Sequence, residues 1–183
     1  MWAGRWPGAD RTAVRGRHPL SRAALAAFVI LAGALGAPAQ ARGPTVCTAL
    51  DRAPEAEFRA LKRFAGATGL RATVAAARTF WHVHATGRLP DCYLTKRAAR
   101  DRGWRSGSSL WRAVPGAAIG GDRFHNREGR LPAGFRYVEA DLDYRGGRRG
   151  AKRLIFAVST KGRWRIWVTV DHYRSFVRVP APR

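Results

Sequence analysis

The sequence predicts an α+β fold in which helices come first and an antiparallel β-sheet follows. Apolar residues recur at helical spacing between residues 54 and 102, whereas short β-branched and aromatic runs dominate from residue 136 onward. Helical segments followed by a series of strands are typical of this class. The hydrophobic content of 46% is enough for a packed core, so disorder is not expected.

Three helices are expected in the first half of the chain. Pro54 suits the first turn of a helix over residues 54–65, and one face of that helix is apolar: Phe58, Leu61 and Ala65. A second helix over residues 70–85 is expected to bury one stripe: Leu70, Val74, Ala77 and Trp81. Thr95 is a good N-cap for a short third helix that ends at Arg102.

Strands are expected in the second half, where turns separate alternating or continuous apolar runs. They cover four segments: residues 136–144, 153–159, 163–170 and 176–179. Residues 120–129, which begin and end with glycine, are interpreted instead as a loop.

The chain is strongly basic, with Lys+Arg 34 against Asp+Glu 12 and a formal net charge of +22 over 183 residues. Such a surface attracts polyanions, nucleic acid first and anionic membranes or glycans next. Arginine is spread along the whole chain, so charge alone indicates an anionic partner without identifying it.

Residues 1–41 are expected to be an export signal. Five arginines make a basic leading region: Arg5, Arg11, Arg15, Arg17 and Arg22. Residues 23–37 form an uncharged apolar run that is short for a membrane span, and the Ala-Gln-Ala of residues 39–41 supplies a cleavage pattern, which predicts a mature start near Arg42. An uncleaved anchor or a buried helix is the alternative.

Export would place the two cysteines in an oxidising environment. Cys47 and Cys92 are the only cysteines of the chain, and we expect a disulfide between them. This bond would close a loop of about 45 residues and contribute on the order of 4 kcal/mol in the chain-entropy model. A lone pair of cysteines lacks the four ligands of a structural zinc site.

Cleavage of RNA without a metal defines the residue types to look for in so basic a chain. A base takes the proton of the 2′-hydroxyl, an acid protonates the departing 5′-oxygen, and fixed cations hold the charge of the phosphorane. Glu139 is the candidate base, and period two along its strand places Asp141 and Asp143 on the same face. Arg149 and Arg153 are expected to return to that face, where they would neutralise the aspartates and keep a carboxylate ionised.

Histidine supplies the candidate acid. His172 follows an apolar strand, and from the end of that strand its side chain can project into a groove. A lone histidine is more often structural, but a basic groove beside a carboxylate-bearing strand favours a catalytic role. His82 and His84 stand two residues apart on an expected helix, point to different faces and are interpreted as surface residues.

The loop over residues 120–129 carries an acid near its end. Guanine presents two adjacent donors, N1–H and N2–H₂, beside the O6 acceptor. The Glu128 carboxylate can accept both donors while the backbone N–H groups of Asn126 and Arg127 meet O6, as suits an unpaired base. A solvated turn is the alternative.

Six runs follow one another in order over residues 89–176: LPDCYLTK (89–96), GW (103–104), PG..IGGD.F.NREG.LP (115–132), Y.EADLDY (137–144), RGAKRLIF (149–156) and TVDHYRSF (169–176). In these runs the chain resembles the barnase-like family of small secreted microbial guanyl-preferring ribonucleases. The resemblance implies N-terminal helices packed on a C-terminal antiparallel sheet. The domain would cover residues 71–183, after an N-terminal extension with one helix at residues 42–70.

The resemblance also implies roles for the matching residues. Glu139 would be the general base and His172 the general acid, and the roles would reverse when water hydrolyses the 2′,3′-cyclic phosphate. Three cations would stabilise the phosphorane: Lys96, Arg149 and Arg153. Tyr173 would line the site, and Phe124 would pack below the guanine loop. That loop would comprise Asn126, Arg127 and Glu128. His125 stands where the family usually has a small polar residue; it could stack on a base, tune the pH dependence or be exposed, and we expect it to be exposed.

The expected partners are single-stranded RNA and an acidic protein inhibitor in the cytoplasm of the producing cell. We expect a secreted monomer that needs no cofactor and has no stable membrane association after cleavage of the signal. Two alternatives stay open. One is a metal-dependent nuclease that uses Asp141, Asp143 and Asp171, and the other is a non-catalytic basic module that binds RNA or anionic surfaces.

Overall fold

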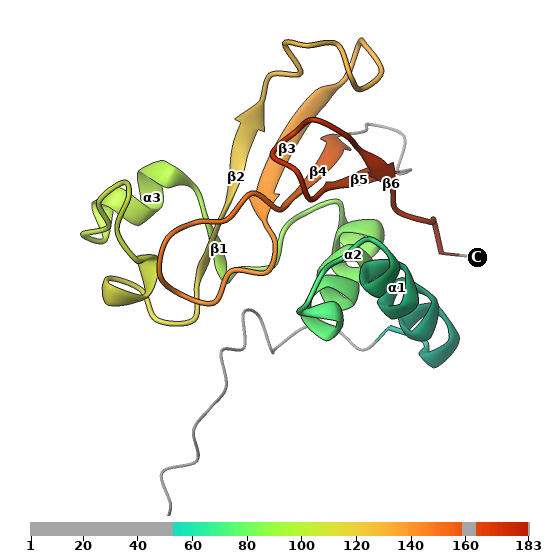
Figure 1. Ribbon diagram of the computed structural model, residues 1–183, viewed down its shortest axis with the longest axis horizontal. Helices are drawn as coiled ribbons and strands as arrows, with labels where there is room; N and C mark the ends of the chain where they lie inside the picture. The colour runs from blue at the N-terminus through green and yellow to red at the C-terminus, as the bar shows by residue number, and fades with distance from the viewer. Residues whose placement is uncertain (1–52, 159–163, 183) are drawn as a thin grey trace, which may run out of the picture. The chain divides into compact units, whose positions relative to one another are not determined.

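The computed structural model describes residues 53–158 and 164–182, which contain a six-stranded sheet with two longer helices against one of its faces (Figure 1). The strands lie side by side in chain order: β1 (Tyr93–Leu94), β2 (Ala118–Phe124), β3 (Arg136–Asp141), β4 (Arg153–Val158), β5 (Arg165–Thr169) and β6 (Val177–Arg178). Neighbouring strands are antiparallel except β1 and β2, which are parallel. The expected α+β class is therefore confirmed.

The main hydrophobic core lies between the sheet and helices α1 (Glu55–Ala67) and α2 (Thr73–Thr86). Phe80 of α2 is fully buried in this core, and its ring meets that of Phe64 on α1 edge-on at 6.0 Å. The predicted stripe of the second helix is wrong at Val74, which is 42% exposed. Helix α2 instead buries a face that includes Ala76, Phe80 and Val83.

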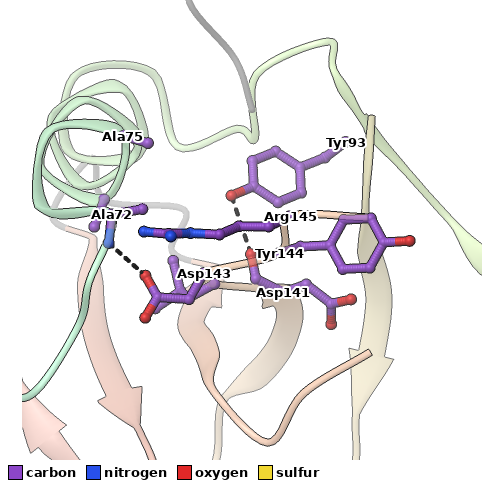
Figure 2. Close-up of a pocket in the computed structure, with 9 residues that line it drawn as sticks. Ala72, Ala75, Tyr93, Asp141, Asp143, Tyr144 and Arg145 are labelled. Atoms are coloured by element: carbon purple, nitrogen blue, oxygen red, sulfur yellow. Dashed lines mark hydrogen bonds between the residues drawn. The ribbon is translucent and has the colours of Figure 1, made fainter. Parts of the chain in front are cut away.

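The first turn of α2 receives its cap from the turn that follows β3 (Figure 2). Ala72 precedes the helix and has no side-chain oxygen, so the Asp143 carboxylate accepts the backbone N–H groups of Arg71 and Ala72, each at 2.8 Å. The prediction that Asp143 shares a face with Glu139 is therefore wrong. Strand β3 ends two residues earlier, and a φ of +55° at Asp143 turns its carboxylate toward the helices.

A second core cluster forms where α3 (Lys96–Asp101) and a turn of 3-10 helix (Leu110–Arg112) pack beside β1 and β2. The Thr95 hydroxyl accepts the Ala98 N–H at 3.1 Å, so the expected N-cap of the short helix is present. Strand β2 occupies the first half of the segment interpreted as a loop. A side chain at Gly120 would collide with Ala140 at 2.8 Å, which explains a glycine inside this strand.

His82 and His84 are half-buried, so their interpretation as surface residues is wrong. The C-terminal segment covers this part of α2: His84 donates a hydrogen bond to the Pro180 carbonyl, and burial lowers the pKa of His84. The predicted export signal and Cys47 lie outside the described residues. Among the residues that are described, no helix is long and apolar enough to cross a bilayer.

Candidate active site

The face of the sheet turned away from α1 and α2 carries the candidate site. Along β3, Ala140 joins the core under the helices, so its neighbours Glu139 and Asp141 project from the opposite face, as period two predicts. Ile155 of β4 and Trp167 of β5 lie beside Glu139 in register. We call this surface the Glu139 face.

Glu139 is held between two donors. Its side chain accepts a hydrogen bond from Lys96 Nζ at 2.8 Å on Oε1 and one from the Tyr173 hydroxyl at 2.6 Å on Oε2, while the residue is only 8% exposed. Burial raises the pKa of Glu139, but these hydrogen bonds and the charges of Lys96 and Arg153 outweigh burial and leave the pKa below its usual value. The carboxylate is therefore ionised at neutral pH. Burial and the bond to Glu139 raise the pKa of Tyr173 to about 12, so its hydroxyl stays a donor.

Lys96 reaches Glu139 because the start of α3 is anchored on β2. The Lys96 N–H donates to Asp122 Oδ2 at 2.9 Å, and Asp122 stands opposite Glu139 in the β2–β3 register. The ammonium group also lies 3.9 Å from that Asp122 oxygen, so it sits between two carboxylates. Sequence reasoning missed Asp122, whose only signal is its place beside two glycines.

Asp141 gathers the two arginines of the site. Arg149 donates to both of its oxygens at 2.7 Å, in the paired geometry that suits guanidinium and carboxylate. Arg153 Nε lies 3.1 Å from Asp141 Oδ1 without hydrogen-bond geometry, and Arg153 Nη1 donates to the carbonyls of Gly150 and Lys152. Asp141 is 2% exposed, so these contacts form in a largely dry environment.

His172 lies in a tight loop over residues 171–175, shortly after the end of β5 at Thr169. Both His172 and Tyr173 have positive φ, at +57° and +70°, a backbone region that is costly for residues other than glycine. Two side chains hold the loop: Thr169 Oγ1 accepts the Tyr173 N–H at 3.0 Å, and the Asp171 carboxylate accepts the N–H groups of Arg174 and Ser175. Hydrogen bonds from Ser175 hold the pKa of Asp171 well below its usual range.

The 124–131 loop shares a hollow of about 380 Å³ with the 171–175 loop. The hollow is lined by Phe124, His125, Asn126, Arg127, Glu128, Arg130, His172, Tyr173 and Arg174. The Phe124 ring stacks on the Tyr173 ring at 5.2 Å, so the floor of the hollow is continuous with the hydroxyl that contacts Glu139. His125 is exposed at the rim.

The side chain of Asn126 shapes this loop. Its amide accepts the Leu131 N–H at 3.0 Å and donates to the Leu131 carbonyl at 2.8 Å, while its own φ is +45°. A further bond joins the two loops: Arg130 Nη1 donates to the Arg174 carbonyl at 2.6 Å.

Comparison with known proteins decides the family. A family model described as ribonuclease matches residues 77–180. A ribonuclease from Heyndrickxia coagulans is 46% identical over 95 residues, which cover 50% of this chain and 84% of that protein. Ribonucleases from Bacillus intermedius and Bacillus pumilus are also 46% identical over 95 residues, and the match covers 56% of each. The chain belongs to this ribonuclease family.

The expected family is thus confirmed, and the ribonuclease site can be compared with the residues expected from the sequence. One group gathers around Glu139 and its strand neighbour Asp141: Lys96, Glu139, Arg149, Arg153 and Tyr173. A second group lines the hollow with His172: Phe124, His125, Asn126, Arg127 and Glu128. Tyr173 belongs to both groups. Sequence reasoning missed Arg130 and Arg174, because only the folded loops bring them together.

The aspartates of the metal-dependent alternative do not converge. Asp141 pairs with two arginines, Asp143 caps α2, and Asp171 holds its own loop. Within the described part of the chain, no three His, Cys, Asp or Glu side chains are grouped as metal ligands would be. The three aspartates are instead engaged with arginines or with backbone N–H groups.

Proposed function

We propose that the protein is a metal-independent endoribonuclease that cleaves single-stranded RNA, preferentially after guanine. The observation that carries this proposal is the Glu139 carboxylate, kept ionised between Lys96 and Tyr173 next to a hollow that His172 also lines. An ionised carboxylate and a histidine at one basic site are the pair that RNA transesterification requires.

In the proposed first step, Glu139 accepts the proton of the 2′-hydroxyl, whose oxygen then attacks the adjacent phosphorus. Protonated His172 gives its proton to the departing 5′-oxygen, which leaves a 2′,3′-cyclic phosphate and a free 5′-hydroxyl. In the second step His172 takes a proton from water and Glu139 returns one to the 2′-oxygen, which yields a 3′-phosphate. Three cations stabilise the charge of the phosphorane: Lys96, Arg149 and Arg153.

The base would occupy the hollow of the 124–131 loop. The Glu128 carboxylate would accept guanine N1–H and N2–H₂, and the backbone N–H groups of Asn126 and Arg127 would meet O6. Phe124 forms the floor against Tyr173, which supports a flat ligand there. Adenine does not present the same pair of donors, so it would bind less well.

We also propose that residues 1–41 direct export, that a Cys47–Cys92 disulfide forms outside the cytosol, and that the enzyme acts as a secreted monomer. An active ribonuclease threatens the cell that makes it before export. The net charge of +22 would favour an acidic protein inhibitor in that cytoplasm. A small acidic open reading frame beside the gene is the expected source of this inhibitor.

Product mapping on a defined RNA oligonucleotide tests the proposal. Cleavage after guanosine with cyclic-phosphate ends is expected, and it should survive excess EDTA. Glu139→Ala and Glu139→Gln should lower the rate by about 10²-fold or more, as loss of a general base does. Glu55→Ala, which removes an exposed carboxylate of α1, is the matched control and should cut normally. Near-normal turnover by Glu139→Ala, or RNA binding without cleavage by the wild type, would overturn the mechanism.

A further inference from the structure

One exposed aromatic ring lies near the site without a part in the proposed chemistry. Phe135 precedes β3, and 37% of the residue is exposed although it is a large apolar side chain. Its ring lies 6.2 Å from the ring of Tyr137, and the guanidinium carbon of Arg165 lies 5.0 Å from its centroid. Arg165 is itself exposed, so the pair forms a flat, cationic patch at the protein surface.

The register of the sheet places this pair on the Glu139 face. Tyr137 lies two residues before Glu139 on β3, and it pairs with Ala157, whose partner on β5 is Arg165. Tyr137, Ala157 and Trp167 belong to the cluster under that face. Because Phe135 touches both Tyr137 and Arg165, its ring lies at the end of the same surface.

The site residues follow a fixed order along β3. Asp141, which contacts the arginines, is the last residue of the strand, and Glu139 lies two residues before it. Tyr137 stands opposite Phe124, the floor of the hollow, and Phe135 lies beyond it. A guanosine in the hollow, with its 3′-phosphate at Glu139, would therefore send its 5′ neighbour toward Phe135.

The buried ring of Tyr137 joins Phe135 to the floor of the hollow. Centroids lie 6.4 Å apart from Phe124 to Tyr137 and 6.2 Å apart from Tyr137 to Phe135. Proteins bind single strands by stacking bases on aromatic rings and guanidinium planes beside cationic groups. An exposed phenylalanine with an arginine against it has this chemistry.

We propose that Phe135 and Arg165 form a base-stacking subsite for the nucleotide on the 5′ side of the cleaved guanosine. The inference rests on the proposed ribonuclease activity and adds to it a preference for substrates longer than a dinucleotide. Stacking reads no base edge, so the subsite accepts any base and favours purines for their larger rings.

The test compares the dinucleotide GpA with the trinucleotide ApGpA. For the wild type, kcat/KM should be higher for ApGpA by about fivefold or more, the lower end of what one stacked base contributes. Phe135→Ala should bring this ratio close to one while GpA is cut at the wild-type rate. Phe135→Trp should keep the ratio, and Val74→Ala, which trims an exposed apolar side chain on α2, is the matched control.

A ratio unchanged by Phe135→Ala overturns the subsite, and so does an equal loss on both substrates, since that reveals a structural role. If the wild type cuts neither substrate, the proposed activity fails instead. Binding of the uncleavable deoxy trinucleotide d(ApGpA), followed by fluorescence anisotropy, then decides on the subsite alone: weaker binding by Phe135→Ala supports it, and equal binding refutes it. Arg165→Gln should weaken this binding in the same direction.

Discussion

Replacement of Asp141 by asparagine would test whether the Asp141 carboxylate has a structural role or a catalytic or metal-binding one. Asparagine keeps the shape of the side chain but loses its charge and turns an amide N–H₂ toward guanidinium donors. Asp141 is 2% exposed and stands against both Arg149 and Arg153. Breaking a buried ion pair by removing one partner costs about 3–5 kcal/mol, because a buried charge stays behind.

The expected cost lies near the lower end of that range, at about 3 kcal/mol. Arg153 keeps the carbonyls of Gly150 and Lys152 as acceptors, and Arg149 is exposed enough to turn partly toward water. The free energy of unfolding from urea titrations, followed by tryptophan fluorescence, measures this difference. Activity should fall too, since Arg149 then loses the paired hydrogen bonds that the Asp141 carboxylate accepts.

The matched control is Asp101→Asn. Asp101 pairs with Arg97 one helical turn away, at 4.0 Å and with both side chains exposed, so its loss should cost less than about 0.5 kcal/mol. If the free energy of unfolding of Asp141→Asn lay within about 1 kcal/mol of the wild-type value, the argument that buried Asp141 neutralises Arg149 and Arg153 would be refuted.

Three further predictions concern the proposed reaction. Lys96→Met removes a hydrogen-bond donor and a charge that lower the pKa of Glu139, while burial, which raises it, remains. The pKa of Glu139 should therefore rise, and the acid limb of the profile of kcat/KM against pH should move to higher pH. The control Arg97→Met should leave this limb in place. Asn126→Ala loses both hydrogen bonds to Leu131 and places alanine at a positive φ, so the rate of GpA cleavage should fall toward that of ApA. Asn126→Gly loses the same hydrogen bonds but tolerates the positive φ, so it should retain more activity. With three phosphate-facing cations, RNA affinity should drop about tenfold or more between 50 and 200 mM salt, and a flat profile would contradict a role of the basic surface in binding.

Period two along β3 correctly placed Glu139 and Asp141 on one face, because this alternation is a property of any extended strand. The same rule failed at Asp143, where the strand had ended and a positive φ redirected the side chain. Nothing in the composition of the segment marks that change. The helix start that Asp143 caps is 71 residues away in the chain, so only the fold shows why an acid is needed there.

The prediction of a loop from residue 120 onward missed β2 for a related reason. Two adjacent glycines usually indicate a turn. Here Gly120 lies inside a strand because the side chains of Tyr93 and Ala140 fill the space of a Cβ, and Gly121, with a φ of +97°, lies where the register shifts before Asp122. A glycine required by a distant neighbour and a glycine required by a turn look identical in one sequence.

The histidine of the site shows how far local patterns reach. The apolar strand before His172 predicted that this residue lies near a strand end. The positive φ values of His172 and Tyr173 could not be predicted, because neither position is a glycine. Those values persist because the side chains of Thr169 and Asp171, which precede His172, accept backbone N–H groups of the residues that follow it. A hydrogen bond from Arg130 also holds this loop against the neighbouring one. The backbone that aims His172 is thus fixed by side chains outside the acid–base pair. A pattern of residue types could identify the histidine, whereas its direction depends on contacts that only the folded chain creates.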